Sequence, residues 1–286
     1  MSDANRELAR HWIAASPFAQ ALGVVLEALE PERARLALPF LERNANPGAA
    51  LHGGVAASLA VIAAGALARA IQGASAAPWH TAALQVSYLS AAIGEPVAAR
   101  AELLRRGKEL CFALVEVETQ AGKPVASATA MLRGRAGAPP AALAESSASR
   151  SAGEPGAFGR ALSKLSFIAA CGIEVQEMAA GRSRLALPCA RENTDAGGGV
   201  HEGALLALFD TAGAAAAWSE IGPGPYKAST PALQVQVLAP PAAEGLVAHG
   251  HCRQRDQELF FCDVEVSGAQ SRQIVARGAL HYRIVR

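Results

Sequence analysis

The pattern of hydrophobic and polar positions in the first half of the chain predicts one long helix among several strands. Residues 55–70 form an apolar segment rich in alanine that is long enough for a helix. Elsewhere apolar and polar side chains alternate at strand spacing, as in residues 32–39. Strands are predicted over residues 23–29, 32–39, 81–90, 96–106, 109–119 and 124–132, and a short helix over residues 5–15. Strands joined by tight turns beside one long helix imply an antiparallel sheet wrapped around that helix.

The second half of the chain repeats the first at a constant offset of 149 residues. The offset relates His52 to His201, and it needs no gap from the Phe18/Phe167 pair to the end of the second copy. A register this long indicates a tandem duplication of whole domains. We therefore predict an N-terminal domain over residues 1–133 and a C-terminal domain over residues 157–286. Residues 134–156 are rich in Ala, Gly, Ser and Pro, which predicts a linker.

Each copy contains a glycine-rich loop that ends in a histidine and leads into the long helix. The two loops cover residues 46–54 and 195–203. Backbone amides at the start of a helix are unpaired and carry the positive end of the helix dipole, so they suit a developing negative charge. The loops are therefore the first candidates for a functional site.

The two copies differ in a complementary way. The first copy has Asn46 and Gly53 in its loop but Val61 in the following helix. The second copy has Glu202 at the position of Gly53, and it has Asp210 at the position of Val61. Valine cannot accept or hold a proton, so the first copy keeps the loop residues but lacks the acid, and the second copy supplies the acid. Each copy therefore holds half of one site. We predict one working site and one degenerate site in each chain.

Composition narrows the range of functions. The 286 residues include 26 basic and 25 acidic side chains, a formal charge of +1 that argues against a protein built to bind nucleic acid or an anionic membrane. The five cysteines form no C-x-x-C pair and predict a reduced, cytoplasmic setting. The charged N-terminus does not resemble a signal peptide, and the apolar run over residues 55–68 is short for a membrane span. His249 and His251 would share a strand face, where we expect a surface and no metal site.

The loop Asn46…Leu51-His52-Gly53-Gly54, with the strand order around it, resembles the hotdog-fold thioesterases. Leu89-Ser90 at a strand end and Arg106-Gly107-Lys108 at a later turn resemble the acyl-CoA thioesterases of the phenylacetate pathway in particular. The resemblance covers nearly all of both copies. It implies an α+β fold, a tandem double hotdog in which each half is an antiparallel sheet wrapped around a long central helix.

The resemblance also implies which residues form the site, because in that family two hotdogs pair and share each catalytic centre. Asn46, His52, Gly53 and Gly54 would come from the first half, and Asp210 and Thr230 from the second. The Gly53 amide would polarise the thioester carbonyl, and Asp210 would act as general base or as nucleophile; the sequence leaves these two roles open. Thr230 would orient the water or the carboxylate, Asn46 would position the substrate, and His52 would hold the loop.

Coenzyme A carries several phosphates, so cationic side chains are expected near the mouth of the site. Family resemblance suggests one cluster in the first half and an equivalent cluster in the second. The candidates are Arg105, Arg106 and Lys108, with Arg253 and Arg255.

The predicted function is hydrolysis of an acyl- or aryl-CoA, without a metal or redox cofactor, by a chain that associates as a homodimer of double hotdogs. Two alternatives remain. One is a non-catalytic protein that binds or senses acyl-CoA. The other is an enoyl-CoA hydratase of hotdog fold, which would need an Asp and a His a few residues apart on one loop.

Overall fold

The computed structural model describes residues 2–72, 79–134, 143–148 and 153–285. The first half contains α1 (Asp3–Ala14), α2 (Pro17–Leu22), β1 (Val25–Leu29), β2 (Arg33–Leu38), η1 (Glu42–Asn44), α3 (Gly53–Gln72), β3 (Trp79–Tyr88), β4 (Val97–Arg106), β5 (Leu110–Thr119) and β6 (Pro124–Gly134). The second half contains α4 (Gly156–Leu162), α5 (Ser166–Ala170), β7 (Glu174–Ala179), β8 (Arg182–Leu187), η2 (Arg191–Asn193), α6 (Glu202–Ile221), β9 (Lys227–Val237), β10 (Leu246–Asp256), β11 (Leu259–Gly268) and β12 (Ile274–Val285).

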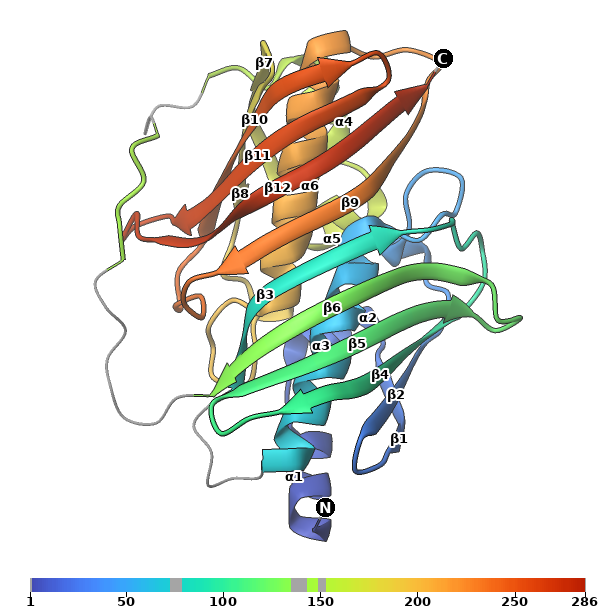
Figure 1. Cartoon of the computed structure of the whole chain (residues 1–286). Coiled ribbons are helices and arrows are strands. Elements are labelled where there is room, and N and C mark those ends of the chain that lie inside the picture. Colours follow the sequence, from blue (N-terminus) through green and yellow to red (C-terminus); the bar gives the residue numbers. More distant parts are fainter. Residues whose placement is uncertain (1, 73–78, 135–142, 149–152, 286) are drawn as a thin grey trace.

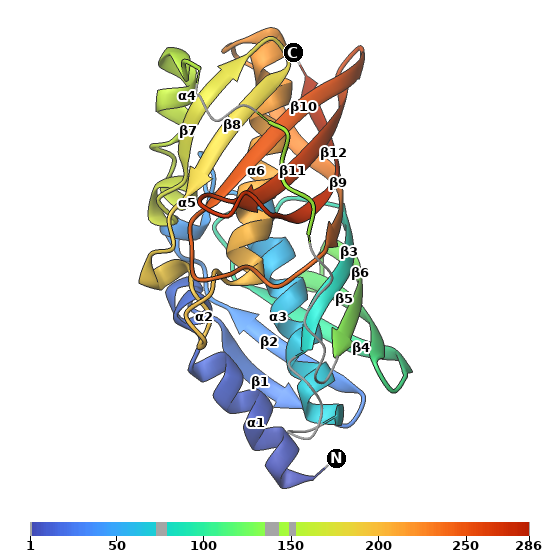
Figure 2. The ribbon, with the colours of Figure 1, turned by 90° about the vertical axis from the view of Figure 1, so that its left-hand side faces the viewer.

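All the strands of the described residues belong to one antiparallel sheet of 12 strands, in the order β1-β2-β4-β5-β6-β3-β9-β12-β11-β10-β8-β7. The two long helices α3 and α6 lie on one face of this sheet, α6 above α3 in Figure 1, and they pack against each other through their N-terminal turns. Figure 2 shows that the ends of the sheet curve round the helices. Each half is thus a sheet wrapped around a central helix, and the predicted double hotdog is confirmed.

The two halves are related by a pseudo-twofold axis between β3 and β9. These strands pair from Ala83 with Gln236 to Ser87 with Ala232, and at the centre of the ladder Gln85 faces Gln234. Gln85 and Gln234 are counterparts in the sequence repeat. The pseudo-twofold axis therefore passes between these two glutamines. Every other pair of equivalent residues in the two halves is related by this axis.

Small residues let α3 and α6 approach closely. A Cβ on Gly54 would lie 2.7 Å from Cα of Ala207, and one on Gly203 would lie 2.8 Å from Oγ of Ser58. The Ser58 hydroxyl donates to the carbonyl oxygen of Gly203 at 3.0 Å. By length and composition α3 is apolar enough to cross a membrane, but it is almost entirely buried inside the protein. It is therefore a core helix, as predicted, although the argument from length was wrong because the helix is long enough to span a membrane.

The prediction that the repeat needs no gap to its end is wrong for the last strand. In the first half Val117 of β5 pairs with Ala126 of β6, whereas in the second half Val266 of β11 pairs with Ala276 of β12. The first residues of these pairs are 149 positions apart, but the second residues are 150 apart. One extra residue therefore lies in the turn between β11 and β12. The cause is a longer turn, which shifts the last strand without disturbing its pairing.

The predicted linker lies partly outside the described residues. Strand β6 ends at Gly134 and α4 begins at Gly156, and the described residues 143–148 lie along the second half. Ser146 donates its hydroxyl hydrogen to Glu265 at 2.5 Å, and Glu145 forms a β-bridge with Gln273. The domain boundaries themselves stay a prediction.

Candidate active site

The site lies where β3 and β9 part. Their ladder ends at Ser87 and Ala232, and the next residue of β9 is Pro231, which has no N–H to extend it. Beyond this point lie Tyr88 of β3 and Thr230 of β9, and both line a cavity of about 490 Å³. Its lining brings together the start of α3, the middle of α6, the loop before α3 and the α4–α5 region. The cavity is therefore formed by both halves of the chain.

Five of the six predicted site residues, drawn from both halves of the chain, meet in this cavity. Asn46, His52 and Gly53 line it from the first half, and Asp210 and Thr230 line it from the second. Gly54 lies directly behind them, with its amide directed to His52 and Asp210. The sequence prediction that an acid of the second half faces the loop of the first half is thus matched by the geometry.

Asp210 is a buried carboxylate held on two sides. The Thr230 hydroxyl donates to Oδ1 of Asp210 at 2.8 Å. Burial raises the pKa of Asp210 above its usual value, and this effect is opposed by the Thr230 hydrogen bond and by the Gly54 amide. A carboxyl group with a raised pKa binds a proton more readily than an exposed one, which suits a general base. The same shift is a feature of functional carboxylates.

His52 holds the loop and is not ionised. Its Nδ1 accepts a hydrogen bond from the Gly54 amide at 3.0 Å, so the ring proton lies on Nε2. Burial lowers the pKa of His52, and the charge of Asp210 only partly offsets this. The 3.7 Å between His52 Nδ1 and Asp210 Oδ2 is therefore not an ion pair. His201 makes the same bond to Gly203 at 2.9 Å, although the helix residue of the other half that would face it is Val61 and not an acid, which supports a structural role for both histidines.

Gly53 presents its amide next to the acid. Within the described residues no protein acceptor bonds to the Gly53 N–H, as expected for the first residue of a helix. A Cβ at Gly53 would lie only 2.9 Å from Oδ2 of Asp210. The free amide and the carboxylate thus border the same small space, and a side chain on Gly53 would intrude into it.

Tyr88 is a site residue that the sequence reasoning missed. Its hydroxyl donates to the carbonyl oxygen of Gly53 at 3.1 Å, so it fixes the first peptide of α3. Burial, and then the charge of Asp210, raise the pKa of Tyr88, which keeps the phenol protonated and able to donate. Its counterpart in the second half is Val237, so the repeat itself could have marked Tyr88 as special to one site.

The second possible site lies between the loop of residues 195–203 and α3, and it is filled by the protein's own side chains. Glu202 accepts hydrogen bonds from the Thr81 amide at 3.0 and 3.2 Å. Arg69 lies 3.9 Å above the Trp12 ring and donates to the carbonyl oxygen of Trp79 at 2.7 Å. Burial raises the pKa of Glu202 and lowers that of Arg69 to about 10. This arrangement has no carboxylate at the position of Val61, in agreement with a degenerate site.

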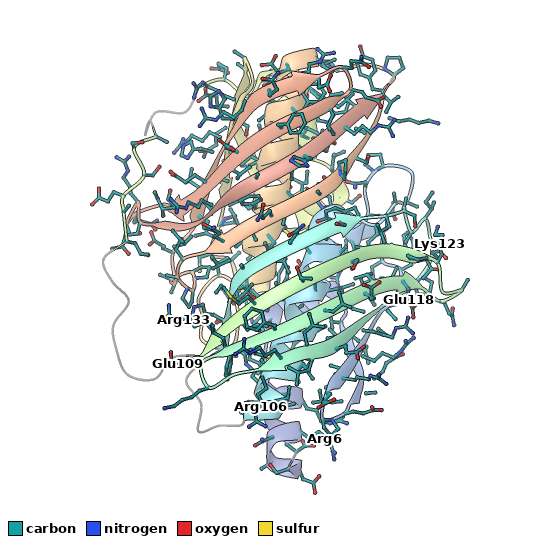
Figure 3. All side chains as sticks on the ribbon, in the orientation of Figure 1. Arg6, Arg106, Glu109, Glu118, Lys123 and Arg133 are labelled. Atoms are coloured by element: carbon teal, nitrogen blue, oxygen red, sulfur yellow. The ribbon has the colours of Figure 1, made fainter. Side chains whose placement is uncertain are left out.

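The cationic residues predicted to bind coenzyme A do not line the cavity. Arg106 lies at the end of the first half where α3 finishes, whereas the cavity lies where α3 begins (Figure 3). Arg253 is paired with Asp263 at 2.7 Å, and Arg255 donates to the carbonyl oxygen of Gln257. Arg105 and Lys108 are also absent from the lining, which instead includes Arg283. A role of the predicted five in binding the coenzyme stays a prediction.

No group of three or more His, Cys, Asp or Glu residues that could hold a metal ion occurs among the described residues.

Comparison with known proteins gives the class. A structure described as a conserved protein with hot dog fold from Alicyclobacillus acidocaldarius matches with a TM-score of 0.64 and 17% identity, over 92% of this chain and 96% of that one. The TesB protein of Mycobacterium avium subspecies paratuberculosis matches with a TM-score of 0.66 and 12% identity, over 95% and 100%. The acyl-CoA thioesterase II TesB2 of Mycobacterium marinum gives 0.64 and 14%, over 93% and 96%. These likenesses show a tandem hotdog fold.

The sequence itself then gives the type of domain. Residues 41–133 match the family described as the acyl-CoA thioesterase N-terminal domain. No curated protein has significant sequence similarity to the chain. The chain is a tandem hotdog protein whose residues 41–133 match the acyl-CoA thioesterase N-terminal domain family, and this match supports hydrolase activity on acyl-CoA thioesters. The narrower resemblance to enzymes of the phenylacetate pathway stays a prediction.

Proposed function

We propose that the chain hydrolyses the thioester of an acyl- or aryl-CoA at one composite active site between its two halves. The observation that carries the proposal is the meeting of Asp210, from the second half, with the free amide of Gly53, from the first. An ionisable group and an unpaired donor at one buried point are what acyl transfer to water requires.

The Gly53 amide would stabilise the charge that develops on the thioester oxygen. It lies at the positive end of α3, and its donor has no other protein partner among the described residues. Loss of one such donor typically costs about 2.7–4 kcal/mol of barrier. The Tyr88 bond to the Gly53 carbonyl and the His52 bond to the Gly54 amide hold the loop in place, so little reorganisation is needed during the reaction.

Asp210 would supply the second element of the reaction. As a general base it takes a proton from water, the water oxygen attacks the carbonyl carbon, and the carbon–sulfur bond breaks to release the coenzyme thiolate, which is then protonated. As a nucleophile its carboxylate would attack the carbonyl carbon and break the carbon–sulfur bond, which releases the coenzyme thiolate and leaves an anhydride; water then hydrolyses the anhydride to the free acid and the Asp210 carboxylate. In both routes the Thr230 hydroxyl fixes Oδ1 and leaves Oδ2 toward Gly53. Asn46 lines the same cavity and would position the substrate or the water.

The test is release of coenzyme A thiol from a panel of acyl-CoAs, followed with a thiol reagent. Asp210→Asn keeps the volume and an acceptor for Thr230 but removes the base, so we expect activity to fall by about 10²–10⁴-fold. Glu202→Gln is the matched control, because it changes a buried acid on the same helix in the filled region, and it should keep activity. Full activity of Asp210→Asn would refute the composite site.

The same assay separates the alternatives. A protein that binds acyl-CoA tightly but releases no thiol would be a binding or sensing module. Addition of water to an enoyl-CoA, read as loss of its double bond without thiol release, would identify a hydratase. Either result would replace the proposed function.

We also propose that two chains associate and that the protein works in the cytoplasm. Leu104, in the bulge of β4, is 58% exposed, and Leu110 at the start of β5 is 37% exposed, so these two neighbouring strands offer exposed apolar side chains to a second copy. The five cysteines are free thiols, as expected in a reducing compartment. Light scattering after size exclusion would measure the mass, and a monomer would refute the association.

A further inference from the structure

We propose that the cavity beyond Asp210 is a short acyl pocket that ends at Trp218 and Tyr282 and selects a compact acyl group, such as a single ring or a hexanoyl chain, over long chains. This inference rests on the proposed function and names its substrate class. It is carried by the two unlike ends of the cavity, by the positions along α6 and by the fixed aromatic wall.

The two ends of the cavity differ in exposure and chemistry. Leu89, Ser90 and Ala91 form one end and are exposed, Leu89 to 56%. The other end has a buried or half-buried apolar wall formed by Leu162, Leu165, Ile168, Ala214, Ala215 and Trp218, while the exposed Ala228, Ser229 and Arg283 line the cavity from β9 and β12. An apolar acyl group gains free energy by leaving water, whereas the polar pantetheine arm must reach solvent. The acyl group is therefore assigned to the Trp218 end.

The spacing along α6 sets the length of the pocket. Asp210, Ala214 and Trp218 are four residues apart, so they lie on one face of the helix and all line the cavity. At 1.5 Å per residue, Trp218 begins about 12 Å along the axis from Asp210. A tryptophan side chain also leans back toward the helix N-terminus, and contacts of about 3.5–4 Å are needed at each end. The remaining length suits one ring or a short chain.

The wall at Trp218 is held from several sides. Its Nε1–H donates to the Tyr282 hydroxyl at 3.1 Å. The Phe158 ring meets it edge-on at 5.3 Å, and the Tyr226 ring lies at 6.1 Å. Behind these rings lies a separate buried cluster formed by Ala216, Ala217, Phe260, Cys262 and Ile284. Because the indole is bonded and packed, a longer chain cannot displace it without losing these contacts.

In the first half, the face of α3 that corresponds to the cavity-lining face of α6 is covered by other side chains. The counterpart of Ala214 is Gly65, and the counterpart of Trp218 is Arg69. A Cβ on Gly65 would lie 2.8 Å from the ring of Trp12, which therefore occupies the space beside this helix. The small Ala214, in contrast, borders open cavity. The space beside α6 is thus a feature of one half.

The experiment changes the length of the pocket from both directions. Trp218→Ala removes the wall, Ala214→Leu fills the space one turn before it, and Trp218→Phe keeps a ring but loses the bond to Tyr282. For each, kcat/KM is measured with butyryl-, hexanoyl-, phenylacetyl-, decanoyl- and palmitoyl-CoA. The unsubstituted protein should prefer hexanoyl- and phenylacetyl-CoA.

Trp218→Ala should raise the decanoyl-to-hexanoyl ratio of kcat/KM at least about tenfold, because each methylene newly buried favours binding by a few-fold. Ala214→Leu should raise the butyryl-to-hexanoyl ratio by a similar factor, and Trp218→Phe should keep the parent order. Ala214→Leu adds volume to open space, so it tests the pocket even if Trp218→Ala does not fold. Glu220→Ala, on the same helix but lining a different cleft, is the control and should keep the parent order.

The outcomes separate the pocket from the proposed function. Hydrolysis with ratios that neither substitution moves would refute the acyl pocket and leave the hydrolase intact. If no acyl-CoA is hydrolysed, the proposed function fails, and binding of thioether analogues of the same chain lengths, measured by calorimetry, tests the pocket on its own. Analogue affinities that shift with Trp218→Ala and Ala214→Leu as described would support it, and unmoved affinities would overturn it.

Discussion

Gly53→Ala adds one methyl group at the point where the two halves meet. An ideal Cβ at this position lies 2.9 Å from Oδ2 of Asp210, 3.5 Å from its Cγ and 3.6 Å from Oδ1. The backbone itself accepts a side chain, because the φ angle of Gly53 is not in the left-handed region and Glu202 occupies the same position in the other half. We therefore expect the variant to fold and the carboxylate to move.

The size of the effect follows from that contact. Oδ2 has to retreat by roughly 0.5–1 Å to reach an ordinary van der Waals distance of about 3.5 Å. A misplacement of about 1 Å at a reacting group can lower a rate about 10²-fold. At 1.36 kcal/mol per factor of ten, this is about 2.7 kcal/mol of barrier. The loss should fall on kcat, since the two ends of the cavity keep their side chains.

Thiol release with the preferred acyl-CoA measures this loss, and thermal unfolding shows whether the variant is folded. Gly197→Ala makes the same change in the exposed loop of the second copy and should keep activity. If Gly53→Ala stays within about threefold of the parent in kcat while Asp210→Asn is inactive, the amide and the carboxylate do not share a reacting atom.

Three further predictions concern the residues around the acid. Thr230→Val removes a hydrogen bond that lowers the pKa of Asp210, so the acid limb of the kcat/KM profile should move to higher pH; an unmoved limb would contradict this role. Tyr88→Phe loses a bond of about 0.5–1.5 kcal/mol to the Gly53 carbonyl, and kcat should fall about 2- to 12-fold at unchanged KM, which steady-state kinetics measures. The raised pKa of folded Asp210 gives stability below its unfolded pKa that is lost as pH rises through the folded pKa. Asp210→Asn should therefore melt higher than the parent at pH 8, with a difference that shrinks toward acid pH; equal melting curves at every pH would refute this.

The fold could be predicted from sequence because the repeat carries more information than either half alone. A constant offset between loops, helices and strand motifs required two equal domains, and the glutamines at 85 and 234 that mark the offset also mark the axis. The extra residue before β12 escaped notice for a physical reason. Both last strands are rich in small apolar residues, so a shift of one position leaves a plausible pattern, although it exchanges the faces of the strand. The backbone pairing resolves it.

Some residues of the candidate site could be predicted from the sequence and others could not, depending on whether the repeat or the three-dimensional fold brings them to the cavity. Asp210 and Gly53 stand in positions that the repeat compares directly, so their complementary losses were visible in the chain. Tyr88 and Trp218 take part because β3 and β9 separate beside α6, and no sequence spacing reports where strands from two halves part. The cationic residues were predicted from family resemblance alone; none of the five lines the cavity, and Arg106 lies at the far end of the first half (Figure 3).

The asymmetry of the two sites has a physical explanation in the tandem chain. In a dimer of identical domains each substitution appears in both sites, so a buried acid and a free amide must be kept in every copy. Once the halves are joined, each can change alone. Val61 replaces an acid whose burial is unfavourable, as the raised pKa of Asp210 shows at the counterpart. Trp12 and Arg69 pack against each other beside α3, so this region gains buried contacts, whereas the second half keeps in Asp210 a buried acid that the proposed reaction would use.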